Sequence, residues 1–175
     1  MGTRLDDERF GAWMNLLQAN AIVAEALEQR LQAECELSLA ENETLARLAH
    51  SPEGRLRMAD VANLMLVSKS GVTRLIDRLE GAGLATRALC STDRRVTYAA
   101  ITPAGREALD RSRPVMAEAL ETAFSRHLAD ADVRALRRAL RKVLEGNGEW
   151  EESRCSPTFS AGPSDGERRV KKVPH

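Results

Sequence analysis

The chain has 175 residues, of which 43% are hydrophobic and only 3% aromatic, and its 26 basic and 26 acidic residues give a formal net charge of zero. This length and apolar content suit one domain with a buried core, and the scarcity of aromatic side chains favours packed helices over sheet. The sequence shows no secretion signal and no apolar run near the ~20 residues that a bilayer requires, so we expect a cytoplasmic protein without membrane contact.

Residue types that carry catalysis or bind metals are sparse. Cys35, Cys90 and Cys155 lie far apart in sequence, and the three histidines form no ligand motif, so we expect neither a disulfide framework nor a metal site. No phosphate-binding loop, dinucleotide motif or nucleophile elbow is present. We therefore expect no enzyme activity and no cofactor.

The N-terminal part of the chain is predicted to form two helices. Apolar residues recur every three or four positions over residues 6–35, which indicates one long amphipathic helix. Ser38 and Glu41 have the spacing of a capping box, which begins a second helix that ends near His50.

The middle of the chain is predicted to form a helix, a tight turn and a second helix. The segment 57–66 is short and helical, and Ser68 is placed to cap a helix over residues 69–82. Gly83 directly follows and suits the left-handed position at a helix end.

Two strands and two further helices are expected after the helix pair. The segments 84–89 and 96–101 alternate in polarity around a polar loop, which predicts an antiparallel hairpin. Thr102 then caps a long helix that runs to about residue 128, and Pro114 is expected to bend it. A last helix begins near Asp130, and the Gly-, Ser- and Pro-containing residues 148–175 are expected to be a disordered tail.

The charge is unevenly distributed along the chain. Residues 1–54 carry 4 basic and 10 acidic side chains, whereas residues 55–106 carry 9 basic and 4 acidic ones. A basic segment between balancing flanks is what a local surface for a polyanion looks like.

One face of the helix over residues 69–82 has the chemistry of DNA base recognition. On a helical wheel, Ser70 and Arg74 point away from the apolar side, with Thr73 and Arg78 at the margins. Arginine reads guanine, and serine or threonine reads several bases, in a major groove that admits one helix. Two further candidate contacts belong to the start of this helix: Ser68 at its N-terminus and Lys69, which we expect to contact phosphate.

The loop between the two strands carries Asp93, Arg94 and Arg95. An arginine at the tip of a hairpin that follows a recognition helix can enter the minor groove, where the negative potential is strongest. Asp93 is expected to pair with an arginine or with the loop backbone and so to fix the direction of the tip.

The segment from "RMADVANLMLVSKSGVTRLIDRLEGAGLATRAL" to "CSTDRRVTYAAITPAGREAL" resembles the core of MarR-family transcription regulators. Asp93, Arg95, Ile101 and Thr102 match the wing signature of that family, and "DRLE" followed by "GL" fits as well. The resemblance implies a mainly α fold: a winged helix-turn-helix with flanking dimerisation helices and one two-stranded β wing.

The same resemblance implies a ligand-responsive repressor that binds a pseudo-palindromic double-stranded DNA operator as a homodimer. Its parts are the N-terminal dimerisation helix 1–37, the DNA-binding domain 38–105 and the C-terminal dimerisation helices 106–147. Small aromatic or phenolic effectors bind between the dimerisation helices and the winged domain in such proteins. The residues that we place at that junction are Trp13, Leu17, His50 and Arg55.

Two other functions stay open at this point. A thiol-based redox sensor requires an activated cysteine, and Cys35 lies between Glu34 and Glu36, whose carboxylates disfavour the thiolate. Cys90 lies near basic residues of the wing, a more activating setting. The other alternative is a winged-helix module for protein interactions, in which the basic wing plays no part.

Overall fold

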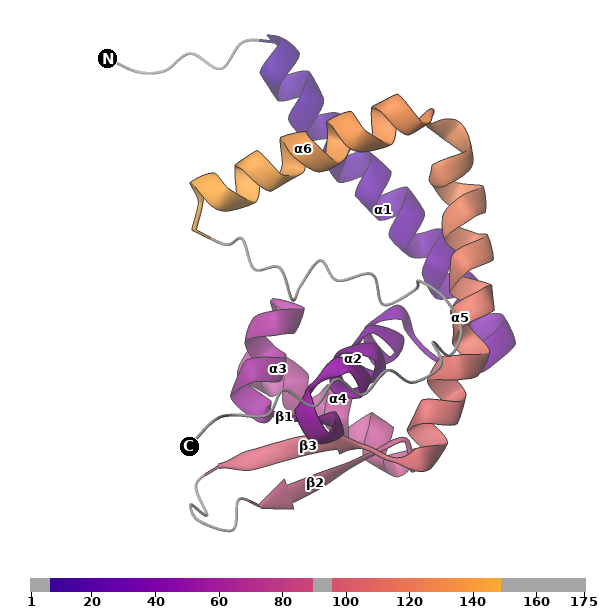
Figure 1. The fold of residues 1–175 in the computed structure, drawn as a ribbon, viewed down its shortest axis with the longest axis vertical. Coiled ribbons are helices and arrows are strands. Elements are labelled where there is room, and N and C mark those ends of the chain that lie inside the picture. Colours follow the sequence, from indigo (N-terminus) through magenta and orange to yellow (C-terminus); the bar gives the residue numbers. More distant parts are fainter. Residues whose placement is uncertain (1–6, 90–95, 149–175) are drawn as a thin grey trace, which may run out of the picture.

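The computed structural model describes residues 7–89 and 96–148. The main elements, shown in Figure 1, are α1 (Asp7–Cys35), α2 (Leu39–His50), β1 (Arg55–Arg57), α3 (Met58–Met65), α4 (Lys69–Gly81), β2 (Ala85–Leu89), β3 (Thr97–Ile101), α5 (Pro103–Ala123) and α6 (Asp130–Gly146). The tip of the wing and residues 149–175 of the expected tail lie outside the described residues.

The predicted helix starts are confirmed by their capping hydrogen bonds. The Ser38 Oγ accepts from the backbone N–H of Glu41, and the Glu41 carboxylate accepts from the backbone N–H of Ser38, so the capping box is complete. The Ser68 Oγ accepts from the N–H of Gly71, and the Thr102 Oγ1 accepts from the N–H of Gly105. These local patterns therefore set where α2, α4 and α5 begin.

Gly83 ends α4 as predicted. Its φ of 72° is left-handed, and the N–H of Leu84 reaches back to the carbonyl of Leu79 at 2.8 Å. The N–H of Gly83 itself donates to the carbonyl of Glu80, which completes a Schellman motif. The motif reverses the chain so that β2 can return along α4.

The sheet has three strands, one more than the sequence predicted. β1 pairs with β3 in antiparallel register, with Arg55 opposite Ala100, so that the order is β1-β3-β2. The segment 57–66 was expected to be helical throughout, but α3 begins only at Met58. Three residues are too few to show a periodic pattern. This strand forms only because it pairs with β3.

The helix after the wing is shorter than predicted. α5 ends at Ala123, where Phe124 leaves helical geometry with φ −135°, and a separate 3-10 turn covers Ser125–His127. α5 continues as one helix through Pro114.

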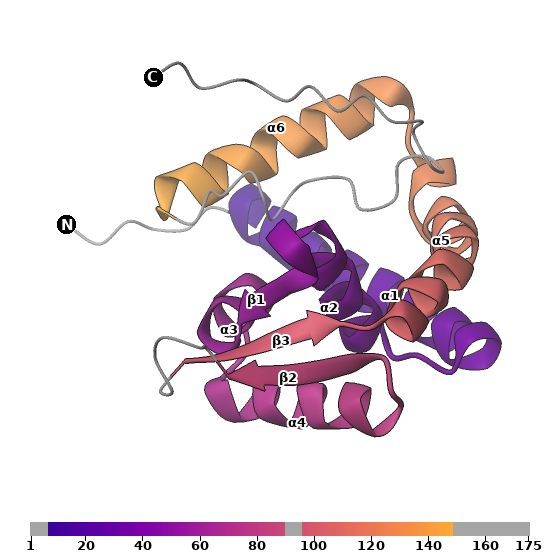
Figure 2. The ribbon, with the colours of Figure 1, turned by 60° about the horizontal axis from the view of Figure 1, so that its bottom comes forward.

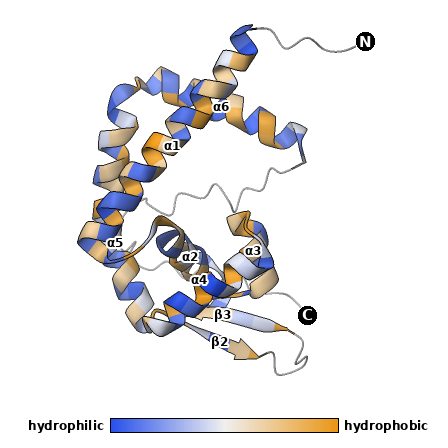
Figure 3. Ribbon diagram, turned by 180° about the vertical axis from the view of Figure 1, so that it is seen from behind, coloured by the Kyte–Doolittle hydropathy of each residue, from blue (hydrophilic) through white to orange (hydrophobic). Residues whose placement is uncertain are grey.

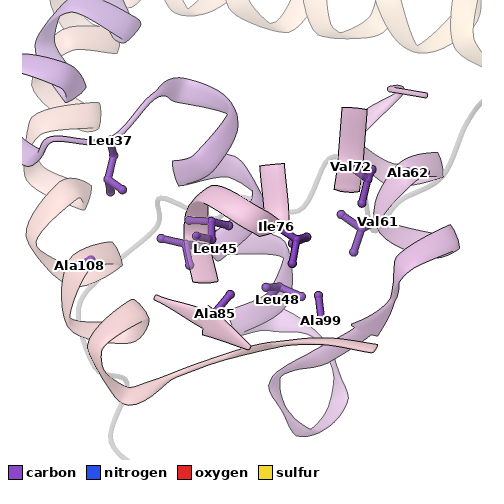
Figure 4. Close-up of a cluster of buried hydrophobic side chains, with 11 residues drawn as sticks. Leu37, Leu45, Leu48, Val61, Ala62, Val72, Ile76, Ala85, Ala99 and Ala108 are labelled. Atoms are coloured by element: carbon purple, nitrogen blue, oxygen red, sulfur yellow. The ribbon is translucent and has the colours of Figure 1, made fainter. Parts of the chain in front are cut away.

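The winged domain is built around one apolar cluster. α4 contributes its inner face, and α2, α3, the sheet and α5 contribute the rest, as the close-up in Figure 4 shows. The largest fully buried apolar side chains of this cluster are Leu45, Leu48, Val61, Val72, Ile76 and Leu79. Because α4 packs on this core through one side only, its opposite side faces outward.

A second, smaller cluster joins α1 to α5, which run side by side in Figure 1. Leu27 and Leu31 of α1 pack there against Met116 and Ala119 of α5. Only the C-terminal part of α1 takes part, and α6 has no buried residue at all. Within the described residues, the N-terminal half of α1 and the whole of α6 therefore contribute no fully buried side chain to either cluster.

Candidate nucleic-acid interface

The inner and outer faces of α4 are those that the helical wheel predicted. Val72, Leu75, Ile76 and Leu79 are buried, whereas the candidate DNA contacts Ser68, Lys69, Ser70, Thr73, Arg74 and Arg78 are all exposed. A helix-turn-helix thus presents a polar, positively charged face to the outside.

Hydrogen bonds near the start of α4 separate the exposed side chains into two groups. The Ser68 Oγ is held by the N–H of Gly71 at 3.1 Å, and the Thr73 Oγ1 donates to the carbonyl of Lys69 at 3.0 Å. Within the described part of the chain, the side chains of Lys69 and Arg74 make no hydrogen bond or ion pair. These two cations are therefore available to an anionic partner.

Arg78 is held differently. Its Nε donates to the Oε1 of Glu41 at 2.7 Å, which joins α4 to the first turn of α2. Burial by itself raises the pKa of Glu41, but the hydrogen bonds from Arg78 and Ser38 outweigh it, so that this pKa lies below its usual value. Arg78 thus has a partner within the fold, which the sequence did not indicate.

The wing is tied to α4 by Arg87, a residue that sequence reasoning missed. Arg87 lies on β2, and its Nη1 pairs with the Oδ1 of Asp77 at 2.7 Å and with the carboxylate of Glu80. Its Nη2 also donates to the carbonyl of Thr73 at 3.1 Å. Figure 2 shows β2 lying along α4, so that these contacts bridge the two elements. The clue that the sequence offered was that Asp77 and Glu80 place two carboxylates on one side of α4, where a basic residue could bind.

A hollow of about 670 Å³ lies next to these contacts. It is bordered by the start of α3, by α4 and by the wing strands, and its charged lining residues are Arg57, Lys69, Asp77 and Arg87. The charge of the lining is thus mainly positive. None of the four residues that were expected to line an effector pocket borders this hollow.

Those four residues lie in two separate places of the single chain. Trp13 and Leu17 are on the N-terminal half of α1, with 52% and 42% of their surface exposed. His50 ends α2, and Arg55 begins β1, where it pairs with Glu53 and lies 5.1 Å from the centre of the Tyr98 ring. Figure 1 shows the start of α1 rising away from the winged domain, so the single chain does not bring the two pairs together.

Asp93, Arg94 and Arg95, the three candidates at the wing tip, lie outside the described residues. The strands that lead to them are described. β2 and β3 pair from Ala85 opposite Ile101 to Leu89 opposite Thr97.

Cys35 is partly buried at the end of α1, between the two apolar clusters. Burial raises the pKa of its thiol, and the charge of Glu34 raises it further, whereas Arg111 acts in the opposite direction. The sequence pointed to the carboxylates, but burial is the larger cause. Cys90 lies outside the described residues.

Metal ligands and membrane spans were sought in the same part of the chain. Over residues 7–89 and 96–148, no group of three or more histidine, cysteine or acidic side chains is placed to hold a metal ion. Among the helices of these ranges, none combines the length and apolar character of a membrane span.

A helix-turn-helix with an outward polar face, followed by a hairpin clamped against it, defines a winged helix-turn-helix protein. Comparisons with known proteins agree. The family model described as "MarR family" matches residues 37–96. Among curated protein sequences, no significant match is found.

Three solved structures show the same fold. AbsC of Streptomyces coelicolor, a MarR family transcriptional regulator, is 31% identical, with 85% of this chain and 100% of that chain covered and a TM-score of 0.77. Sco3205 of the same organism, crystallised in complex with DNA, is 28% identical, with 83% and 91% covered and a TM-score of 0.78. BldR of Sulfolobus solfataricus is 26% identical, with 79% and 96% covered and a TM-score of 0.70.

The chain therefore belongs to the MarR family of DNA-binding transcription regulators.

Proposed function

We propose that this protein is a repressor that binds a pseudo-palindromic operator as a homodimer and is released by a small aromatic or phenolic effector. The observation that carries the DNA-binding part is the outward face of α4, where Lys69 and Arg74 are exposed and without a partner in the described fold. A relative at 28% identity, Sco3205, was crystallised with DNA, which supports this reading.

The residues of the interface take different roles in this proposal. Ser70, Thr73 and Arg74 read bases in the major groove, and Lys69 contacts phosphate. Phosphate also approaches the N-terminus of α4 at Ser68, where backbone N–H groups and the helix dipole attract anions.

The wing and Arg78 complete the proposed contact set. Arg94 and Arg95 enter the minor groove, and Asp93 holds the tip in position. Arg78 reaches DNA only by leaving Glu41, because its Nε is 2.7 Å from that carboxylate in the free protein. We therefore expect Arg78 to contribute less to binding than Arg74.

The homodimer is supported by the exposed apolar faces at both ends of the chain. In Figure 3 the ribbons of α1 and α6 carry hydrophobic segments, and several large hydrophobic residues of these helices are exposed in the described chain. On α1 they are Phe10, Trp13, Leu16, Leu17 and Ile22, and on α6 they are Val133, Val143 and Leu144. A second copy of the chain is the natural cover for such faces.

Val143→Glu should then give a monomer by light scattering, with helix content retained.

The effector site is proposed at the junction between the dimerisation helices and the winged domain. Trp13 and Leu17 lie apart from His50 and Arg55 in one subunit, so a shared pocket requires α1 of the second subunit. Salicylate serves as a probe. Release of DNA by salicylate from wild type, and not from a Trp13→Ala dimer, would support this placement.

The proposed function is tested by fluorescence anisotropy with the DNA upstream of the gene that encodes this chain. For about 8 phosphate contacts, log K should fall against log salt with a slope near −7. Arg74→Ala should weaken binding by roughly 1–3 kcal/mol and change sequence preference, whereas Lys69→Ala should weaken all DNA about equally. Arg95→Ala tests the wing in the same assay. Identical behaviour of the Arg74 and Lys69 variants across operators would contradict the assigned roles.

The same titration separates the alternatives. A protein-interaction module predicts no salt-dependent DNA binding by wild type or by Arg95→Ala at low salt. A thiol sensor at Cys90 predicts that peroxide releases DNA from wild type and not from Cys90→Ser.

A further inference from the structure

Arg87 is the one described residue whose side chain connects the wing to several points of the recognition helix at once. From β2 it reaches Asp77 at 2.7 Å, the carboxylate of Glu80, and the carbonyl of Thr73 at 3.1 Å. The backbone N–H of Arg87 also donates to the Oε1 of Glu80 at 2.7 Å. Side chain and main chain of the same residue are therefore both fastened to α4.

The chemistry of these contacts requires arginine. A guanidinium presents several donors in a rigid plane, so it can satisfy two carboxylates and a carbonyl together, which the single ammonium of lysine cannot do in the same geometry. The side chain is only 28% exposed. An ion pair that is partly shielded from water and shared among several acceptors holds its geometry better than a fully exposed pair.

The position of the contacts relates them to DNA recognition. Thr73 lies on the outward face of α4 next to Arg74, whereas β2 leads into the loop that carries the wing tip. The acceptors of Arg87 come from three residues on one side of α4, Thr73, Asp77 and Glu80, and they surround a single guanidinium. Because several contacts in different directions must break together, this clamp limits rotation as well as separation of the two elements.

We propose that Arg87 is a positioning residue for DNA recognition, an inference that rests on the proposed function. It holds the wing at one angle to α4, so that the wing meets the minor groove while α4 lies in the major groove. Once α4 is docked, a wing at a fixed angle binds at a high effective concentration. A wing that is free to rotate loses this advantage, although both sets of DNA contacts are still present.

The first measurement is made on the free protein, so that it does not depend on DNA. Amide hydrogen exchange is compared for wild type, Arg87→Gln and Arg87→Lys, with Arg106→Gln as the control for loss of an exposed arginine near the sheet. Exchange in β2 and β3 should become at least about tenfold faster in Arg87→Gln, because local opening no longer has to break the clamp. Exchange in α1 and α5, and the whole pattern in Arg106→Gln, should stay as in wild type.

The second measurement uses a DNA duplex that the wild-type protein selects from a random-sequence pool. Hydroxyl-radical footprinting follows the minor groove, and protection of guanine N7 from methylation follows the major groove. Arg87→Gln should lose the minor-groove protection under the wing and keep the N7 protection under α4, with affinity lowered by roughly tenfold. Compared with Arg87→Gln, Arg87→Lys should restore only part of the wing protection, because lysine keeps the positive charge but lacks the planar guanidinium with its several donors.

The outcomes separate this inference from the proposed function. Unchanged exchange in the strands of Arg87→Gln would overturn the clamp, whatever the DNA data show. Equal loss of protection in both grooves would also overturn it, because Arg87 would then act on general stability rather than on the angle of the wing. If wild type selects no duplex, the proposed function fails and Arg87 has no part in DNA recognition, while the exchange data still decide whether it holds the wing.

Discussion

The Oγ of Ser112 on α5 lies 2.5 Å from the Oδ1 of Asn42 on α2, and both side chains are buried. This pair joins the winged domain to the helix that leaves it. The Nδ2 of Asn42 is buried without a hydrogen-bond partner in the described fold. A polar pair that is only partly satisfied makes this junction sensitive to substitution.

Ser112→Ala should lower the free energy of unfolding by about 1–3 kcal/mol, because it leaves the whole amide of Asn42 buried without a partner. The double variant Asn42→Leu, Ser112→Ala removes both polar groups, and leucine has nearly the shape of asparagine. It should recover most of the loss. Urea denaturation of the two variants and of wild type makes the comparison, and a double variant less stable than Ser112→Ala would show that packing, not hydrogen bonding, governs this contact.

Gly105→Ala should destabilise the protein by about 1–3 kcal/mol through overpacking. A Cβ at this position would lie 2.1 Å from the backbone carbonyl oxygen of Leu84, at the point where the start of α5 crosses the turn after α4. Backbone atoms cannot move aside as a flexible side chain can. Thermal unfolding by circular dichroism measures the loss.

The matched control is Gly81→Ala in the last turn of α4, where a Cβ meets nothing within 4 Å. This variant should gain about 0.5–1 kcal/mol from the better helix propensity of alanine. Similar losses in both variants would mean that the close approach at Leu84 does not restrict Gly105.

Glu41→Gln should make the dependence of stability on pH weaker at acid pH. The pKa of Glu41 is lowered in the folded protein, so its carboxylate stabilises the fold above its unfolded pKa, and this contribution is lost as pH falls through the lowered folded value. Glutamine can still serve the capping box, so the substitution chiefly removes the charge that pairs with Arg78. The variant should be less stable than wild type at neutral pH, and the gap should close as the solution is acidified.

Urea midpoints measured from neutral to acid pH test this prediction. Arg78→Gln is the partner variant, because it removes the same ion pair from the arginine side. It should also be less stable than wild type at neutral pH, and this difference should also become smaller as the solution is acidified. A gap between wild type and Glu41→Gln that stays constant across the whole range would contradict the role of the ion pair.

Cys35 should react slowly with thiol reagents in the folded protein. Its pKa is raised by burial and by Glu34, so the reactive thiolate is scarcer at neutral pH than in an ordinary cysteine. The rate of alkylation by iodoacetamide, followed by mass spectrometry in a Cys90→Ser, Cys155→Ser background, should rise when the protein is unfolded in urea. Equal rates in the folded and unfolded states would reopen the possibility that Cys35 senses oxidants.

The sequence by itself determined the features of this protein that depend on neighbours along the chain. The helix starts at Ser38, Ser68 and Thr102 and the helix end at Gly83 were readable because a capping group and the backbone groups that it binds lie within a few residues. The inner face of α4 followed from helical periodicity in the same way. The wing signature at Asp93 and Arg95 identified the family before any contact was known.

Only the tertiary structure decided the features that depend on residues far apart in sequence. β1 exists because Arg55 meets Ala100, and no pattern in three residues could predict that pairing. The ion pair of Arg78 with Glu41, a residue 37 positions away, also depends on the fold. The clamp of Arg87 on α4 and the uncovered face of α6 also arise from how elements pack. Periodicity shows that a face is apolar or polar, whereas the fold alone determines which partner it meets.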